Sequence, residues 1–108
     1  MKYDKELFRL KAELCQTFSD PTRLMILNEL REGEKSVGDL VATLGATQAL
    51  ISRHLALLRN KGIVSARRSG VNVYYSLTNP RIVEACDIIH GILMDRVARD
   101  REIAKRFL

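Results

Sequence analysis

The feature that most constrains this chain is a pair of short helix signals separated by only three residues. Ser36 is followed three positions later by Asp39, which matches a capping box at the start of an apolar, helix-periodic run. Residues 45–47 (Gly-Ala-Thr) then end that helix and cap the next, which extends to about Asn60. Two short helices joined by so tight a turn predict a helix-turn-helix over about residues 37–60.

A basic hairpin is expected directly after these helices. Residues 71–77 alternate apolar and polar side chains, which is the period of a half-buried strand. The segment 63–68 precedes them, and Ser69-Gly70 supplies the turn. A helix-turn-helix followed by a hairpin predicts a winged helix, with residues 63–77 as the wing.

Amphipathic helices are expected at both ends of the chain. Apolar residues recur at helical spacing over about residues 4–18, and a second helix over 21–31 should bury Leu24, Leu27 and Leu30 or their neighbours. Asn79-Pro80 opens one long final helix that extends to about Arg106. These outer helices are too apolar to lie exposed on a small domain, so we expect them to form a homodimer interface.

The predicted architecture is therefore a single, mainly α winged helix domain over residues 1–108. Its expected order is four helices, two strands and a helix, with about 4–18 and 80–106 as dimerisation helices. A length of 108 residues fits one domain.

Charge is distributed in a way that favours a polyanionic partner. Between Asp39 and Glu84 the chain has no acidic residue, while six basic residues fall in that interval: Arg53, Arg59, Lys61, Arg67, Arg68 and Arg81. A purely basic segment flanked by segments of mixed charge is typical of proteins that bind nucleic acid.

The helix over residues 48–60 divides into two faces. Polar and small side chains fall within an arc of about 140°, opposite Ile51, Leu55 and Leu58. An ordinary solvent-facing helix mixes Glu with Lys, whereas this arc has no acid. We therefore predict a recognition helix that enters the DNA major groove, with Gln48 and Arg53 at base edges and the Ala49 methyl group at a thymine. Ser52 is expected close to the DNA backbone or a base edge, and Thr47 is expected to cap the helix and meet a phosphate. His54 falls on the apolar side and is expected to be packed inside the protein or to lie between subunits, rather than to contact DNA.

The wing is expected to meet the neighbouring minor groove or phosphates. Arg67, Arg68 and Asn72 flank its turn, and arginine is attracted by the negative potential of a narrow minor groove. The alternative function is a winged helix that docks on proteins without specific DNA binding. An enzyme is not expected, because the sequence has no phosphate-binding loop and no nucleophile paired with a base.

The compartment is expected to be the cytoplasm. The chain has no run of 18 apolar residues, and its charged N-terminal segment does not resemble a signal peptide. Its two cysteines, Cys15 and Cys86, fit a reducing compartment. We expect both to pack as small apolar residues; the alternative is a thiol switch between them.

Four motifs in order resemble the ArsR/SmtB family of regulators. They are D-P-T-R-L-x-I-L at 20–27, Q-x-x-x-S-x-H-L at 48–55, L-R-x-x-G-I-V at 58–64 and Y-Y-x-L at 74–77. The resemblance implies a homodimeric repressor that binds an inverted-repeat operator in double-stranded DNA and is released by an inducer of unspecified chemistry.

The residues that form the known sensing sites of this family are missing from this sequence. The family's cysteine site at the third helix has no cysteine here over residues 34–39, and its Asp-x-His pair is absent because the residue two positions after Asp87 is Ile89. The cysteine pair of sulfur-sensing relatives corresponds to Asn28 and Met94. We therefore predict no metal and no cofactor.

Overall fold

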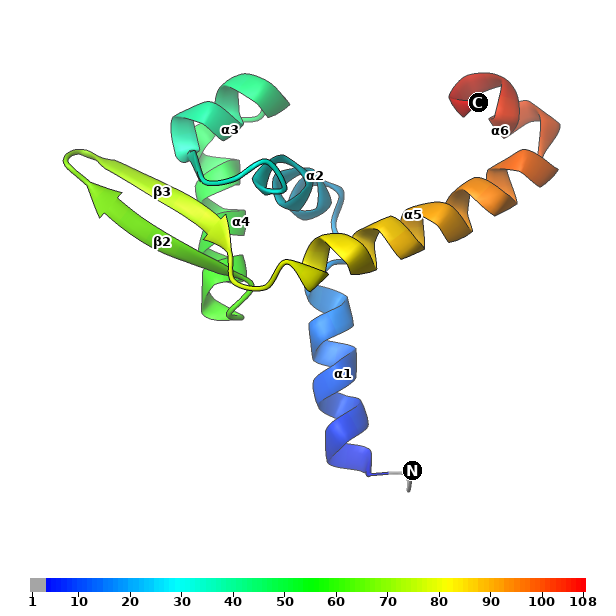
Figure 1. Cartoon of the computed structure of the whole chain (residues 1–108), viewed down its shortest axis with the longest axis horizontal. Coiled ribbons are helices and arrows are strands. Elements are labelled where there is room, and N and C mark those ends of the chain that lie inside the picture. The colour runs from blue at the N-terminus through cyan, green and yellow to red at the C-terminus, as the bar shows by residue number, and fades with distance from the viewer. Residues whose placement is uncertain (1–3) are drawn as a thin grey trace.

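The helices and strands follow one another in the order that the winged helix requires. The computed structural model describes residues 4–108, so Met1 to Tyr3 of the predicted domain lie outside the described residues. The elements are α1 Lys5–Thr17, α2 Pro21–Leu30, β1 Lys35–Ser36, α3 Val37–Leu44, α4 Gln48–Asn60, β2 Val64–Ser69, β3 Asn72–Leu77, α5 Arg81–Arg99 and α6 Arg101–Phe107. The mainly helical winged helix-turn-helix is confirmed (Figure 1).

The hydrophobic core lies between α2, α3, α4 and the base of the wing. Nine buried apolar residues form it: Ile26, Leu27, Leu30, Leu40, Ile51, Leu55, Leu58, Ile63 and Val64. On α2, Leu27 and Leu30 are buried as predicted, whereas Leu24 is 40% exposed and its neighbour Ile26 is buried in its place. Positions 24–27 are all apolar, so their spacing alone cannot say which of them faces inward.

Local capping fixes the helix-turn-helix. Ser36 Oγ accepts a hydrogen bond from the Asp39 amide, and the Ser36 amide donates to the Asp39 carboxylate. This reciprocal box starts α3. Gly45 ends it with φ 66°, a left-handed conformation that glycine adopts without steric cost. Thr47 Oγ1 then accepts from the Leu50 amide at 3.2 Å and starts α4.

The sheet has one strand more than predicted. The predicted hairpin is present, with β2 and β3 antiparallel over six residue pairs. In addition, β1 pairs with the outer edge of β3, which gives the order β1-β3-β2. A strand of two residues is too short to show an alternating pattern, so its sequence carries no strand signal.

The prediction of one continuous terminal helix is also wrong. The chain leaves α5 at Asp100, whose extended backbone ends the helix. The Asp100 carboxylate accepts hydrogen bonds from the amides of Glu102 and Ile103, so it caps α6 as a separate short helix. Aspartate competes for backbone amides in this way and thereby favours helix starts over helix interiors.

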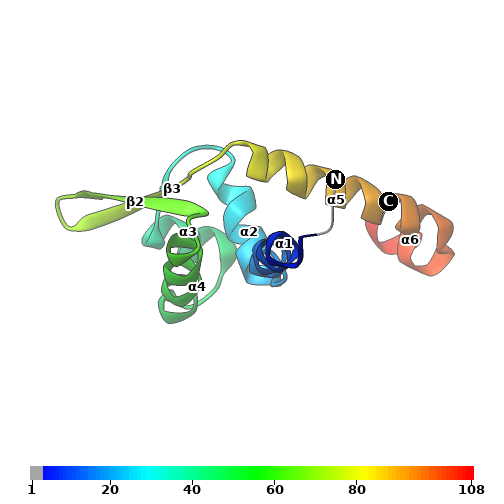
Figure 2. The ribbon, with the colours of Figure 1, turned by 90° about the horizontal axis from the view of Figure 1, so that it is seen from below.

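The overall shape is flat, with extents of 49 × 43 × 22 Å. The wing projects from one end, while α1 and α5 leave the core in different directions at the other (Figure 1). The view from below shows α4 and the wing together on the side away from α5 and α6 (Figure 2). Of the helices within residues 4–108, none has both the length and the hydropathy that crossing a bilayer demands.

Candidate DNA-binding interface

The two faces of α4 differ as the sequence predicts. Ile51, Leu55 and Leu58 are fully buried in the core. On the opposite side, every predicted contact residue is exposed: Thr47, Gln48, Ala49, Ser52 and Arg53. The structure therefore places these five side chains on one free face at the start and middle of the helix.

The start of α4 is suited to a negatively charged ligand. The first turn of the helix has no acidic residue that would offset the positive end of the helix dipole. Thr47 caps the Leu50 amide, while its own side chain stays exposed. Helix N-termini of this kind bind phosphate groups.

His54 holds α4 against α1 and α2 from inside the protein. The imidazole is 6% exposed, as expected for a packed residue. Arg23 Nη1 lies 3.4 Å from His54 Nδ1, and because arginine has only donors, Nδ1 is the acceptor. Arg23 Nε also donates to the Thr17 carbonyl at 2.7 Å. Residues of three helices therefore share one polar network behind the exposed face.

Asp20 completes this network. Its carboxylate accepts a hydrogen bond from the Arg23 amide, which lowers the pKa of Asp20, and it lies 3.7 Å from His54 Nε2. The Asp20 carboxylate therefore caps α2 and faces the ring of a residue on α4. The sequence around Asp20 gives no signal of this second contact, because His54 lies far along the chain.

The wing presents its two arginines on opposite faces of the sheet. Because side chains alternate along a strand, Arg68 shares a face with Ala66 and Val64, which is buried in the core. Arg67 lies on the other face, together with its cross-strand neighbour Tyr74. Asn72 belongs to that outer face as well.

Arg67 is already engaged within the protein. Its Nε donates to Glu34 Oε2 at 3.1 Å and its Nη2 donates to Glu34 Oε1 at 2.6 Å. The guanidinium also stacks over the Tyr74 ring, 5.0 Å from the ring centroid. This bidentate contact lowers the pKa of the Glu34 carboxyl. Sequence analysis missed Glu34, because a partner 33 positions away leaves no spacing signal.

Three other arginines of this surface differ from Arg67 in having no ion pair among the described residues. Among residues 4–108, no carboxylate forms an ion pair with Arg53, Arg59 or Arg68. Arg53 and Arg59 lie on α4 and Arg68 on the wing, and all three are exposed. Unpaired guanidinium groups around one helix face make the surface able to attract phosphates.

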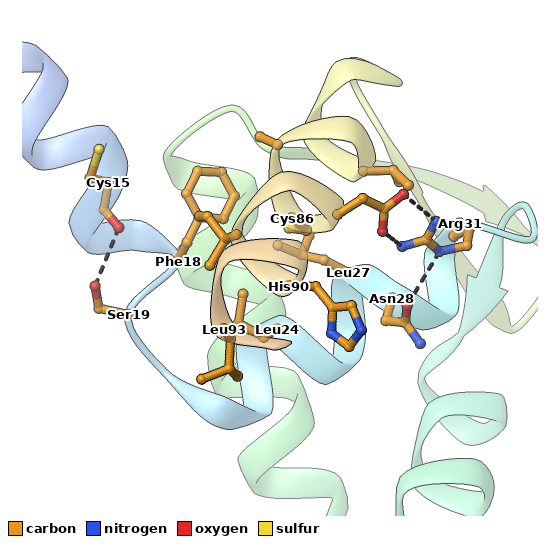
Figure 3. Close-up of a pocket in the computed structure, with 14 residues that line it drawn as sticks. Cys15, Phe18, Ser19, Leu24, Leu27, Asn28, Arg31, Cys86, His90 and Leu93 are labelled. Carbon is orange, nitrogen blue, oxygen red and sulfur yellow. Dashed lines mark hydrogen bonds and ion pairs between the residues drawn. The ribbon is translucent and has the colours of Figure 1, made fainter. Parts of the chain in front are cut away.

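The two cysteines lie on a different surface. Both line an apolar groove of about 560 Å³ between α1, α2 and α5, with Phe18, Leu27 and Leu93 (Figure 3). Cys15 is exposed, so the prediction that it packs as a buried apolar residue is wrong for the single chain, and Cys86 is only partly buried. Burial raises the pKa of the Cys86 thiol, which lowers its thiolate fraction and favours packing over a reactive role. The thiol switch stays an untested hypothesis.

An ion pair crosses the mouth of this groove. Arg31, which ends α2, donates from Nη1 and Nη2 to the two carboxylate oxygens of Asp87 on α5, at 3.0 and 2.7 Å (Figure 3). Within the part of the chain that the structure describes, no three His, Cys, Asp or Glu side chains come close enough together to hold a metal ion.

Comparison with known proteins places these features in one family. Residues 20–66 match the family described as "Bacterial regulatory protein, arsR family". An uncharacterized HTH-type transcriptional regulator of Mycobacterium tuberculosis is 39% identical over 97 residues, which cover 85% of each chain. A biofilm growth-associated repressor of Xylella fastidiosa is 38% identical over 81 residues, which are 75% of this chain and 71% of the repressor.

Solved structures agree with the sequence matches. The crystal structure of the M. tuberculosis regulator superposes with a TM-score of 0.78 and 37% identity, over 91% of this chain and 98% of that one. A homodimeric winged helix-turn-helix DNA-binding domain of Mycobacterium bovis, 23% identical, has a TM-score of 0.76 over 90% of this chain and 92% of that one, which bears on the fold alone.

The names of the relatives are those of regulators and repressors, so the matches do not support the alternative of a winged helix that only docks on proteins. Sequence motifs, capped helix-turn-helix and wing all agree with this comparison. The chain belongs to the ArsR family of bacterial regulatory proteins and is a winged helix-turn-helix transcriptional regulator.

Proposed function

We propose that this regulator represses transcription by binding an inverted-repeat operator as a homodimer. The observation that carries the proposal is the exposed, acid-free face of α4. A helix fits the major groove only where its exposed side chains allow close approach and offer donors and acceptors to base edges. The side chains on this face are small or polar.

The residues divide into base contacts and phosphate contacts. Gln48 and Arg53 have the donors to recognise base edges, and the Ala49 methyl group is suited to contact a thymine methyl. Thr47 and Ser52 lie where the helix approaches the backbone. On the wing, Arg68 and Asn72 are proposed to contact the minor groove or its phosphates, which contributes affinity with little sequence information.

The homodimer is supported by apolar surfaces that the single chain leaves uncovered. On α1, Leu7, Leu10 and Leu14 are 37–50% exposed, and α5 exposes a second set, Ile88, Ile89, Ile92 and Leu93, by 48–65%. Contiguous apolar surface of this kind marks protein interfaces. Because α1 and α5 diverge from the core (Figure 1), a second copy can cover both helices at once.

A symmetric dimer determines the form of the operator. Two copies of α4 related by a twofold axis recognise the same half-site in opposite directions, so the operator is an inverted repeat. We further infer that the protein acts in the cytoplasm and that an inducer releases it from DNA, as the family resemblance implies.

Selection from a random pool of DNA duplexes tests the proposal. Several rounds of binding to the purified full chain should enrich an inverted repeat whose half-site centres lie about 10 base pairs, or a multiple of that, apart. The enriched duplex should bind at least about 1,000-fold more tightly than a scrambled duplex at the same salt concentration. A pool that shows no enrichment after selection would refute specific DNA binding.

A further inference from the structure

The wing carries adjacent arginines whose surroundings differ sharply. Arg68 lies on the sheet face that packs on the core and has no ion pair among residues 4–108. Arg67 lies on the outer face and binds Glu34 through two hydrogen bonds. Adjacent residues of one type in such different environments are expected to have different tasks.

The contact of Arg67 spans the sheet. In the strand order β1-β3-β2, β3 separates Arg67 on β2 from the segment that contains Glu34, just before β1. The side chain crosses β3 by lying over the ring of Tyr74, its cross-strand neighbour. The guanidinium therefore has an aromatic surface beneath it and a carboxylate at its end, so its direction is fixed.

The far end of this contact is connected to the helix-turn-helix. Glu34 lies two residues before Ser36, whose side chain and amide form the capping box of α3. The pair thus joins the middle of the wing to the segment from which α3 starts. The hairpin projects away from the helices (Figure 1), so the pair ties a projecting element to the start of the helix-turn-helix.

We propose that Arg67 is a positioning residue that braces the wing against Glu34, whereas Arg68 supplies the wing's phosphate contact. The inference rests on the proposed DNA-binding function. To bind a phosphate, Arg67 would have to give up a bidentate carboxylate and its stacking on Tyr74, so its net gain from DNA would be small. Arg68 has no such partner within the described residues, so it has no contact of this kind to lose.

The expected effect on affinity is moderate. Both members of the pair are partly exposed, with 57% of the Arg67 side chain and 41% of the Glu34 side chain accessible. Because exposed ion pairs are weak, the expected loss in operator affinity is at most about fivefold per wing, and at most about 25-fold for a dimer with two wings. Losing the brace should therefore weaken operator binding by no more than this factor.

The test compares variants on the duplex obtained by selection, over a range of salt concentrations. We expect Arg67→Ala, Glu34→Ala and the double variant to bind equally weakly, with the salt slope of the parent protein. Arg67→Glu should bind the duplex more weakly than any of these. The charge-exchange variant, which combines Glu34→Arg with Arg67→Glu, should recover an affinity within about threefold of that of the parent protein. Arg68→Ala should instead reduce the slope of the logarithm of the binding constant against the logarithm of the salt concentration by about 0.9 per wing.

Arg67→Lys is a second test of whether residue 67 contacts a phosphate or braces the wing. A phosphate contact tolerates Lys as a point charge, but a bidentate brace does not, so Arg67→Lys should bind like Arg67→Ala. Tight binding by Arg67→Lys, a reduced slope for Arg67→Ala, or no rescue by the charge exchange would overturn the inference while the proposed function stands. Failure of the parent protein to select any duplex would overturn both.

Discussion

Replacing Arg53 with alanine is expected to weaken binding to the selected operator by about 1–3 kcal/mol in each half-site, or roughly 5- to 150-fold. Arg53 lies on the exposed face of α4 and has no ion pair among residues 4–108, so its guanidinium is free to donate to a base edge. The loss should come with relaxed sequence preference at one base pair of the half-site.

A thermodynamic cycle makes this prediction specific. Changing the base pair that Arg53 contacts should weaken the parent protein and leave Arg53→Ala almost unaffected, so the two proteins converge on that duplex. Arg101→Ala is the matched control, because Arg101 is exposed on α6, far from α4 and the wing (Figure 1). If Arg53→Ala binds every duplex as the parent does, Arg53 does not enter the groove.

Replacing Leu55 with alanine is expected to reduce the free energy of unfolding by about 2–5 kcal/mol. Leu55 is fully buried on the inner face of α4, and its removal leaves a cavity in the core between α2, α3 and α4. The effect is measured by urea unfolding at one fixed protein concentration, because dimerisation makes apparent stability depend on concentration.

Leu57 is the matched control for Leu55. It lies on the same helix, and alanine removes the same atoms, but its side chain is 37% exposed. Leu57→Ala should cost about 1 kcal/mol or less. Equal losses at the two positions would show that α4 does not have the inner and outer faces on which the DNA interface depends.

Much of this fold can be predicted from the sequence because local interactions determine it. Ser36 with Asp39, Gly45 and Thr47 each satisfy backbone groups within a few residues of themselves, so their spacing alone indicates where α3 and α4 begin and end. The division of α4 into two faces follows from helical periodicity and is confirmed residue by residue.

The features that the sequence did not predict depend on contacts between distant residues, or on alternative structures that the local sequence does not distinguish. Strand β1 exists only because the edge of β3 is available to residues 35 and 36. The apolar run 24–27 leaves two helix faces equally apolar, and only the packing of α2 in the folded domain determines that Ile26 is buried. Asp100 lies inside an amphipathic run whose periodicity predicts a continuous helix, so the break at which Asp100 caps α6 was not predicted.

In the candidate site, too, the features set by local sequence were predicted and those set by distant contacts were not. Sequence analysis identified the exposed residues of α4, because one helix carries them all. It placed Arg67 and Arg68 together as wing contacts, since both precede the Ser69-Gly70 turn. Only the register of β2 with β3, and the position of Glu34, separate the two residues.

Site-directed photo-cross-linking shows whether the exposed face of α4 enters the major groove. An aryl azide is attached to a cysteine at position 49 (Ala49→Cys) in a Cys15→Ser, Cys86→Ser background, and the selected duplex is irradiated in complex with the protein. We expect cross-links to bases within each half-site, and few from the same label at Arg101→Cys. Equal, non-specific yields from the two positions would show that α4 does not enter the groove.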